Sequence, residues 1–83
     1  MSGETRTALI GIIVENEGAV DELNHLLHEY RKYIIGRMGV PHPQKEMSII
    51  SIALEADQNT ISALSGKLGA LEGVSTKTIY SKN

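Results

Sequence analysis

Ala8-Leu-Ile-Gly-Ile-Ile-Val-Glu15 and Ser48-Ile-Ile-Ser-Ile-Ala-Leu-Glu55 are two versions of one apolar segment, set 40 positions apart in the chain. Each is rich in β-branched residues and too short to be a helix, so each predicts a strand. Side chains of a strand alternate between two faces, and both faces of both segments are apolar. Two apolar faces are typical of a strand in the centre of a covered sheet.

A helical pattern follows each of these strands, with apolar residues at i, i+3, i+7 and i+10. The two stripes are Val20, Leu23, Leu27 and Tyr30, and Ile61, Leu64, Leu68 and Leu71. Asn16 is expected to cap the first helix, and Asp57 or Asn59 the second, because short polar side chains accept hydrogen bonds from free N–H groups there. Gly73 is expected to end the second helix.

Two weaker strands complete the pattern, at Tyr33–Gly39 and Val74–Ser81, and the proline-containing segment Val40–Lys45 predicts a turn before the third strand, Met47–Glu55. This order predicts an α+β fold, a ferredoxin-like βαββαβ sandwich with a four-stranded antiparallel sheet and two helices on one face. Right-handed crossovers place the two apolar strands in the centre. We expect residues 1–83 to form a single domain.

Two helices can cover only one face of such a sheet. The central strands also present apolar side chains to the other face, at Leu9, Ile13, Ile49 and Ala53. An apolar patch in water favours association, and a chain of 83 residues has a small core that oligomerisation often supplements. We therefore expect a homo-oligomer, a dimer or tetramer, joined through this face. The alternative is a mixed surface, containing Gly11 and Ser51, that stays exposed.

The composition argues against several classes of protein. Eight basic and ten acidic residues give a net charge of −2, which offers little support for direct DNA binding. Cysteine is absent, so disulfides and thiolate metal sites are excluded, as fits a reducing compartment. No uninterrupted apolar run is longer than Ile12–Val14, which is too short for a signal peptide or a membrane span. We expect a cytoplasmic protein that does not bind membranes.

No nucleophile stands beside a base, so we expect a protein that is not an enzyme and needs no cofactor. His25 and His28 lie about 60° apart on the solvent side of the first helix. They are weak candidates for a metal site, because metals usually take three or four protein ligands, and the alternative is ordinary solvated histidines. Free N–H groups at a helix start predict a site for an anion or carboxylate at Asn16, Glu17 and Gly18.

Residues 12–24, Ile-Ile-Val-Glu-Asn-Glu-Gly-Ala-Val-Asp-Glu-Leu-Asn, resemble the ACT-domain signature, in which a strand runs into a glycine-bearing loop at the start of the first helix. In that family the loop binds amino acids or other small effectors at a subunit interface. The resemblance implies an effector site at Asn16–Gly18. Glu17 stands here in place of the family's proline.

A second resemblance is to the regulatory half of the nickel-responsive repressors, which assembles as a tetramer and holds nickel through three histidines and a cysteine. It is carried by Leu23-Asn-His-Leu-Leu-His-Glu-Tyr30, the strand Tyr33–Gly39 and Leu71–Val74. His28 matches one of the histidines. The other three ligand positions hold Gly39, Pro41 and Met47. The resemblance therefore implies the fold and the assembly without square-planar nickel binding.

Further motifs cover nearly the whole chain, at Thr5–Glu15, His28–Tyr30, Tyr33–Pro41, Ser48–Ser51, Ile61–Gly69 and Leu71–Ser75. They resemble a small family of iron-only hydrogenase system regulators. The resemblance implies a stand-alone ACT-like regulatory domain that binds a small effector or a regulatory protein partner. Because the net charge gives little support for direct DNA binding, we expect any effect on transcription to pass through a partner that holds the DNA. The alternative function is a metal-sensing module that uses His25, His28 and ligands from another subunit.

Overall fold

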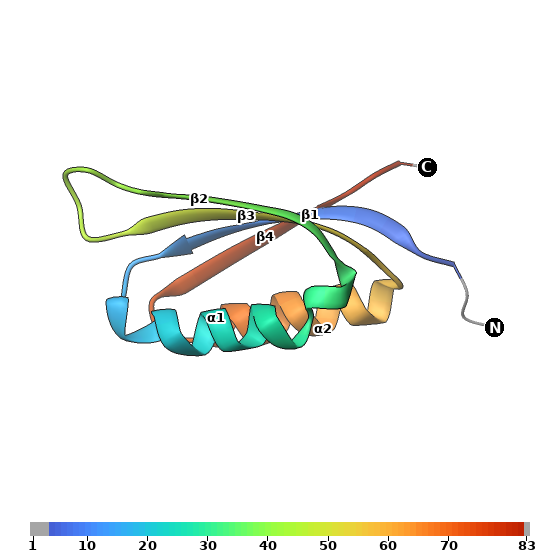
Figure 1. The fold of residues 1–83 in the computed structure, drawn as a ribbon, viewed down its shortest axis with the longest axis horizontal. Helices are drawn as coiled ribbons and strands as arrows, with labels where there is room; N and C mark the ends of the chain where they lie inside the picture. The colour runs from blue at the N-terminus through green and yellow to red at the C-terminus, as the bar shows by residue number, and fades with distance from the viewer. Residues whose placement is uncertain (1–3, 83) are drawn as a thin grey trace.

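The structure is a computed structural model that describes residues 4–82. Its strands and helices run in the order β1 (Arg6–Val14), α1 (Val20–Glu29), β2 (Ile34–Pro41), β3 (Ser48–Ala56), α2 (Gln58–Gly69) and β4 (Val74–Tyr80). Short 3-10 turns, η1 (Glu17–Ala19) and η2 (Arg31–Tyr33), flank α1. Figure 1 shows α1 and α2 lying side by side against one face of the sheet. The predicted βαββαβ order and α+β class are confirmed.

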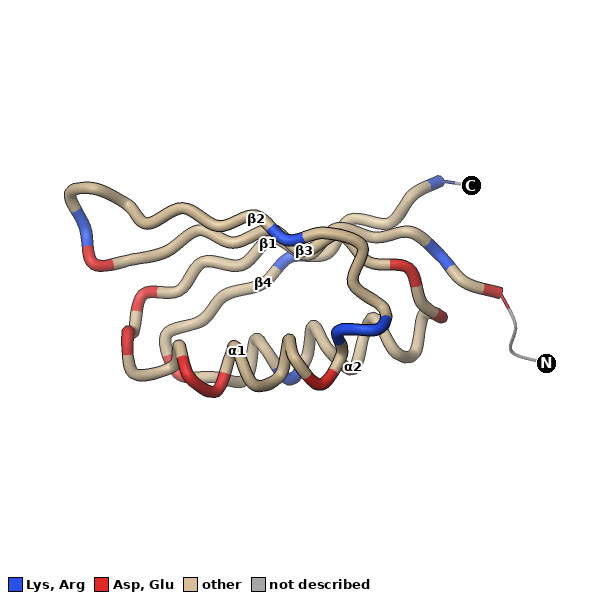
Figure 2. The backbone as a smooth tube through the Cα atoms, viewed as in Figure 1, with Lys and Arg blue, Asp and Glu red and all other residues tan. Residues whose placement is uncertain are grey.

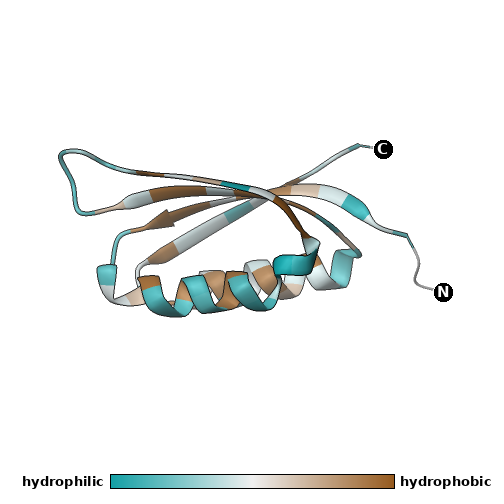
Figure 3. Ribbon diagram, in the orientation of Figure 1, coloured by the Kyte–Doolittle hydropathy of each residue, from teal (hydrophilic) through white to brown (hydrophobic). Residues whose placement is uncertain are grey.

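The sheet is antiparallel throughout and has the strand order β2-β3-β1-β4. The two apolar segments are therefore the central strands, as predicted. Ile10 of β1 lies opposite Ile52 of β3 on one side and Thr78 of β4 on the other. Figure 3 shows the central strands largely in hydrophobic colours, whereas the β2–β3 turn is hydrophilic.

The core lies between the sheet and the two helices, and it is aliphatic. Its fully buried large side chains are Ile10, Ile12, Leu23, Ile52, Leu54, Ile61, Leu64 and Leu68. Burial of each such side chain contributes about 1.5 to 3 kcal/mol. No polar side chain within residues 4–82 is buried with them, so apolar packing fills the layer between the helices and the sheet. Neither described helix combines the length and the hydropathy that crossing a membrane requires.

The second strand extends further than the sequence indicates. β2 begins at Ile34 and continues through Pro41, which pairs with Ser48, so the turn is shorter than the predicted Val40–Lys45. Proline is tolerated there because β2 is an edge strand and Pro41 is its last residue. The hairpin closes when the backbone N–H of His42 donates to the carbonyl oxygen of Met47 at 2.9 Å.

The second helix ends earlier than predicted, and Gly73 has a different role. α2 ends at Gly69, and Gly73 lies in the link to β4 with a φ of +78°. That conformation favours glycine. A Cβ atom at this position would also lie 2.5 Å from the Cβ atom of Asn16. Gly73 is therefore required where this link touches the start of the first helical segment, rather than as a helix terminator.

Candidate functional site

The inward face of β2 is unusually poor in apolar side chains. Opposite residues of antiparallel strands share a face of the sheet. Arg37 pairs with Ile52 and Gly39 with Ile50, and both isoleucines face the core. Gly39 has no side chain to offer, while Arg37 is exposed at the edge of the sheet. The strand therefore leaves space between itself and α1.

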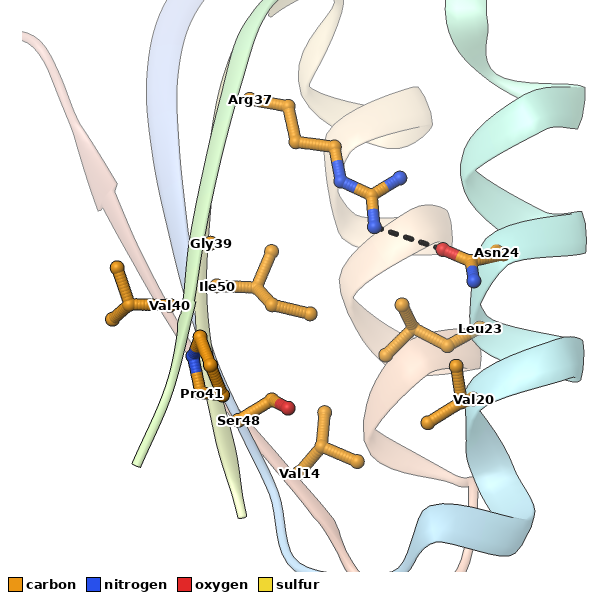
Figure 4. A pocket seen from close by; sticks show the side chains of 10 residues that line it. All are labelled: Val14, Val20, Leu23, Asn24, Arg37, Gly39, Val40, Pro41, Ser48 and Ile50. Carbon is orange, nitrogen blue, oxygen red and sulfur yellow. Dashed lines mark hydrogen bonds between the residues drawn. The ribbon is translucent and has the colours of Figure 1, made fainter. Parts of the chain in front are cut away.

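This space is a cavity of about 440 Å³, which we call the α1–β2 groove. Small-molecule sites commonly have volumes of about 300 to 1,000 Å³. In Figure 4, Leu23 and Ile50 point toward one another across the groove, and Val14 and Val20 line its lower end, whereas Val40 points away. The walls are mostly aliphatic, so the groove suits an apolar ligand body.

One cation stands at the end of the groove. Arg37 Nη2 donates a hydrogen bond of 2.8 Å to Asn24 Oδ1 of α1, which bridges the strand and the helix (Figure 4). Asn24 is neutral, and no carboxylate within residues 4–82 lies at ion-pair distance from Arg37. A guanidinium carries several N–H donors in a planar fork. The remaining donors of Arg37 are thus available to an anionic group.

A second cavity, of about 230 Å³, adjoins the groove on the side of the β2–β3 turn. Both cavities share Val14, Val20, Pro41 and Ser48 as lining residues. Glu17, one of the three loop residues predicted to bind a ligand, lines this second cavity. The structure therefore brings Glu17 near the groove, which the loop motif alone did not indicate.

The other two loop residues, Asn16 and Gly18, are engaged with the protein itself. Asn16 Oδ1 accepts a hydrogen bond from the Gly18 backbone N–H at 3.0 Å, so Asn16 caps the short turn η1 that leads into α1. The helix α1 itself, which the sequence predicted Asn16 to cap, begins after Ala19 without a side-chain cap. Its Nδ2 atom donates to the carbonyl oxygen of Glu72 at 3.4 Å. A ligand at this loop would compete with Asn16 for the Gly18 N–H. Effector binding at Asn16–Gly18 remains a prediction.

The helix histidines lie on the exposed side of α1, where the sequence placed them. His25 Nε2 is 3.3 Å from Glu29 Oε2, one turn further along the helix. His28 is also exposed. Across residues 4–82, no three His, Asp or Glu side chains gather as a metal site would require. A metal held by these histidines would need further ligands from a second copy of the chain.

The sheet face turned away from the helices, here called the outer face, carries all four predicted interface residues, Leu9, Ile13, Ile49 and Ala53. Leu9 and Ile49 are 40% and 39% exposed. The structure adds Val40 and Ile79, which are 52% and 64% exposed and pair with Ile49 and Leu9. These two residues could not be assigned to the outer face from the sequence, because the face on which an edge-strand residue lies depends on the register of its pairing.

Two carboxyl groups outside the groove have shifted pKa values. Hydrogen bonds from Thr5 and, second, Thr7 lower the pKa of Glu55. Hydrogen bonds from the side chain and backbone N–H of Thr60 lower the pKa of Asp57, which caps α2. The Glu55 contacts join β3 to β1 and the residue before it, the Asp57 contacts belong to the N-cap of α2, and neither carboxyl group lines the groove.

Comparison with known proteins gives the family. Residues 6–78 match the sequence model of the family described as "TM1266-like: Iron-only hydrogenase system regulator, putative". The chain belongs to this family. A solved member of similar structure is the uncharacterized protein TM1266 from Thermotoga maritima, with a TM-score of 0.91 and 41% identity over 95% of this chain and 100% of that one. The resemblance to the hydrogenase system regulators is thereby confirmed.

A more distant likeness concerns the fold alone. A formyltetrahydrofolate deformylase from Pseudomonas putida KT2440 has a TM-score of 0.60 and 16% identity, and it covers 96% of this chain and 30% of that one. No curated protein matches the chain. The TM1266-like family thus shares its ferredoxin-like architecture with part of an enzyme, while its own description is that of a regulator.

Proposed function

We propose that this TM1266-like chain is a non-enzymatic, cytoplasmic regulatory domain of the iron-only hydrogenase system. It assembles with itself through the outer face of its sheet and responds to a small effector or a regulatory protein partner. The family description supports the regulatory role. The observation that carries the proposal is the apolar outer face, because a face of this kind needs a cover.

The outer face has the shape that a second copy of the chain can use. Val40, Ile49 and Ile13 follow one another across β2, β3 and β1 and form an apolar row. Beside this row lie the small residues Gly11 and Ser51, which border a shallow cavity of about 360 Å³. A symmetric dimer requires a surface that complements itself across a two-fold axis, and we propose that the apolar row of one copy packs over the hollow of the other.

The test is the oligomeric state of the Ile13→Lys variant in sedimentation velocity. Ile13 lies on the outer face, and a lysine there places a charge in the proposed interface, which is costly unless it is paired. We expect an oligomer for the unmodified chain and a folded monomer for the variant. Ile12→Lys is the control, because Ile12 is 1% exposed on the opposite face and its replacement should unfold the core.

Either of two results would contradict this assembly: a monomeric unmodified chain at micromolar concentration, or an Ile13→Lys variant that keeps both its circular dichroism spectrum and its oligomeric mass. A monomer would also remove the support for ligands shared between subunits. The metal-sensing alternative through His25 and His28 depends on such shared ligands.

Binding is the role that the site chemistry favours over catalysis. The α1–β2 groove is walled by aliphatic side chains, and Arg37 is the charged residue on its lining. Acid–base chemistry needs a proton donor or acceptor near the reacting atoms, whereas a guanidinium stays protonated and acts by orienting anions. The groove is thus suited to recognising an effector.

Regulation through a protein partner is favoured over direct contact with DNA. Duplex DNA is bound chiefly through clusters of Lys and Arg. Figure 2 shows the Lys and Arg positions scattered over the hairpin, the sheet and the helices, and the net charge of the chain is −2. We therefore propose that any effect on transcription passes through a second protein that holds the DNA.

A further inference from the structure

The α1–β2 groove allows the class of effector to be named. We infer that it binds an aliphatic carboxylate, with the carboxylate on Arg37 and the hydrocarbon chain along β2 toward Pro41. This inference deepens the proposed effector role and rests on it. The site differs from the Asn16–Gly18 loop, because neither Asn16 nor Gly18 lines the groove.

The carboxylate follows from the charge on Arg37. Its one hydrogen bond to a side chain in residues 4–82 goes to the neutral Asn24, across the end of the groove. Guanidinium groups bind carboxylates through two parallel N–H···O bonds, which are stronger than bonds to a neutral acceptor. A ligand carboxylate would therefore meet an oriented donor fork that already lies beside an apolar cavity.

The aliphatic body follows from the walls and the length of the groove. Val14, Val20, Leu23 and Ile50 present only methyl and methylene groups to the cavity. From Arg37 to Pro41 the strand advances about 13 Å at 3.3 Å per residue, the length scale of a medium-chain fatty acid. No acidic side chain lines this cavity. An ammonium group beside the carboxylate, as in an amino acid, would thus lack an acidic partner in the groove, since Glu17 lines the adjoining cavity on the side of the β2–β3 turn.

Calorimetric titration with octanoate tests the role of Arg37. We expect saturable binding to the unmodified chain and about tenfold weaker binding to Arg37→Gln, because glutamine keeps a polar side chain at this position but has no charge for the ligand. Arg31→Gln removes the same charge from the exposed turn η2, outside the groove, and should leave the affinity unchanged. Octanol, which lacks the carboxylate, should bind more weakly and equally to all three proteins.

A second variant, Gly39→Val, tests the apolar part of the groove. A Cβ atom at this position makes an ordinary contact of 3.5 Å with Ile50, and the backbone of Gly39 does not have a positive φ, so valine fits the strand while its methyl groups fill the cavity. We expect loss of octanoate binding without a lower melting temperature, because β-branched residues favour strands.

Two outcomes would overturn the inference: no binding of octanoate to the unmodified chain at millimolar concentration, or equal affinity for the unmodified chain and Arg37→Gln. The second result would mean that Arg37 does not hold the carboxylate. Because the assembly is measured separately on Ile13→Lys, the inferred ligand class can fail while the proposed oligomer stands, and the reverse also holds.

Discussion

The two halves of the chain share one architecture and differ where each helix meets its edge strand. Between α2 and β4, Ser65 Oγ lies 3.3 Å from Thr76 Oγ1 and accepts a hydrogen bond of 3.2 Å from the Thr78 hydroxyl. Between α1 and β2, the bond from Arg37 to Asn24 spans the end of an open groove. Asn24 and Ser65 are 41 positions apart, the spacing of the helix repeat, so the two bonds occupy matching places.

The difference comes down to very few side chains. Thr78 of β4 pairs with Ile10, and Gly39 of β2 pairs with Ile50, which is the counterpart of Ile10 in the repeated strand. A threonine therefore closes one half at the position where a glycine opens the other. In a fold built from two similar halves, one half can stay closely packed, here α2 with β4, while the other half, α1 with β2, contains a cavity.

The sharpest test of the comparison removes matching core leucines. Leu64 of α2 and Leu23 of α1 are 0% and 1% exposed and occupy the same place in the repeat. We expect Leu64→Ala to lower the free energy of unfolding by about 3 to 5 kcal/mol and Leu23→Ala by about 2 to 3 kcal/mol, because Leu23 borders an existing cavity and loses fewer packing contacts.

Urea denaturation followed by circular dichroism measures both values. Equal losses of stability for Leu64→Ala and Leu23→Ala would contradict the difference between the halves, since they would mean that α1 and β2 pack as closely in solution as α2 and β4. A smaller loss for Leu23→Ala would support it.

A smaller effect is expected from the polar bridges. Ser65→Ala should cost about 1 kcal/mol, because it leaves the partly buried hydroxyl of Thr78 without its acceptor, whereas Thr76 can still donate to the Ser65 carbonyl oxygen. Asn24→Ala should cost less than about 0.5 kcal/mol, because Asn24 and Arg37 are exposed and water can replace their bond. Thermal unfolding shows which of the two variants is less stable. A larger loss for Asn24→Ala would show that the bond between Arg37 and Asn24 holds α1 in place.

A gain in stability, rather than a loss, is expected within α2. A Cβ atom on Gly66 would meet nothing within 4 Å, so Gly66→Ala should raise the stability by about 0.5 to 1 kcal/mol through helix propensity. Gly69→Ala is the matched change in the same helix, but its Cβ atom would lie 3.2 Å from Thr76 Oγ1. We expect the gain in melting temperature for Gly66→Ala only. A similar gain for Gly69→Ala would mean that Thr76 of β4 moves to make room for the added methyl group.

The sequence was sufficient for the fold because the central strands are apolar on both faces and recur at a fixed spacing. The alternation of Ile10 and Ile12 with Gly11 and Ile13 identified both the core and the outer face. Alternation of this kind depends only on the period of a strand, and the right-handed crossover then leaves one topology for two such units.

The groove could not be predicted, because it depends on the register of an edge strand. The pairing of β2 with β3 shifts by one residue between Ile34 and Gly36. A one-residue shift exchanges the two faces of a strand. Without it, Met38 and Val40 would face α1, and Arg37 and Gly39 would face the outer side. No local pattern in the sequence predicts such a shift, although Gly36 and Arg37, which interrupt the apolar residues of the strand, lie beside it.

The position of β1 has a consequence for how the chain folds. Its described partners are β3 and β4, so that Ile10 meets Ile52 and Thr78, both far away along the chain. Among the described strands, two that follow one another in the chain pair with each other only in the β2–β3 hairpin. Long-range pairing requires the closure of large loops, and the entropy lost in that closure precedes the stabilising contacts, which slows folding. The first strand of the sheet therefore completes its pairing only when β4, the last strand, is in place, and its apolar faces are open to aggregation in the meantime.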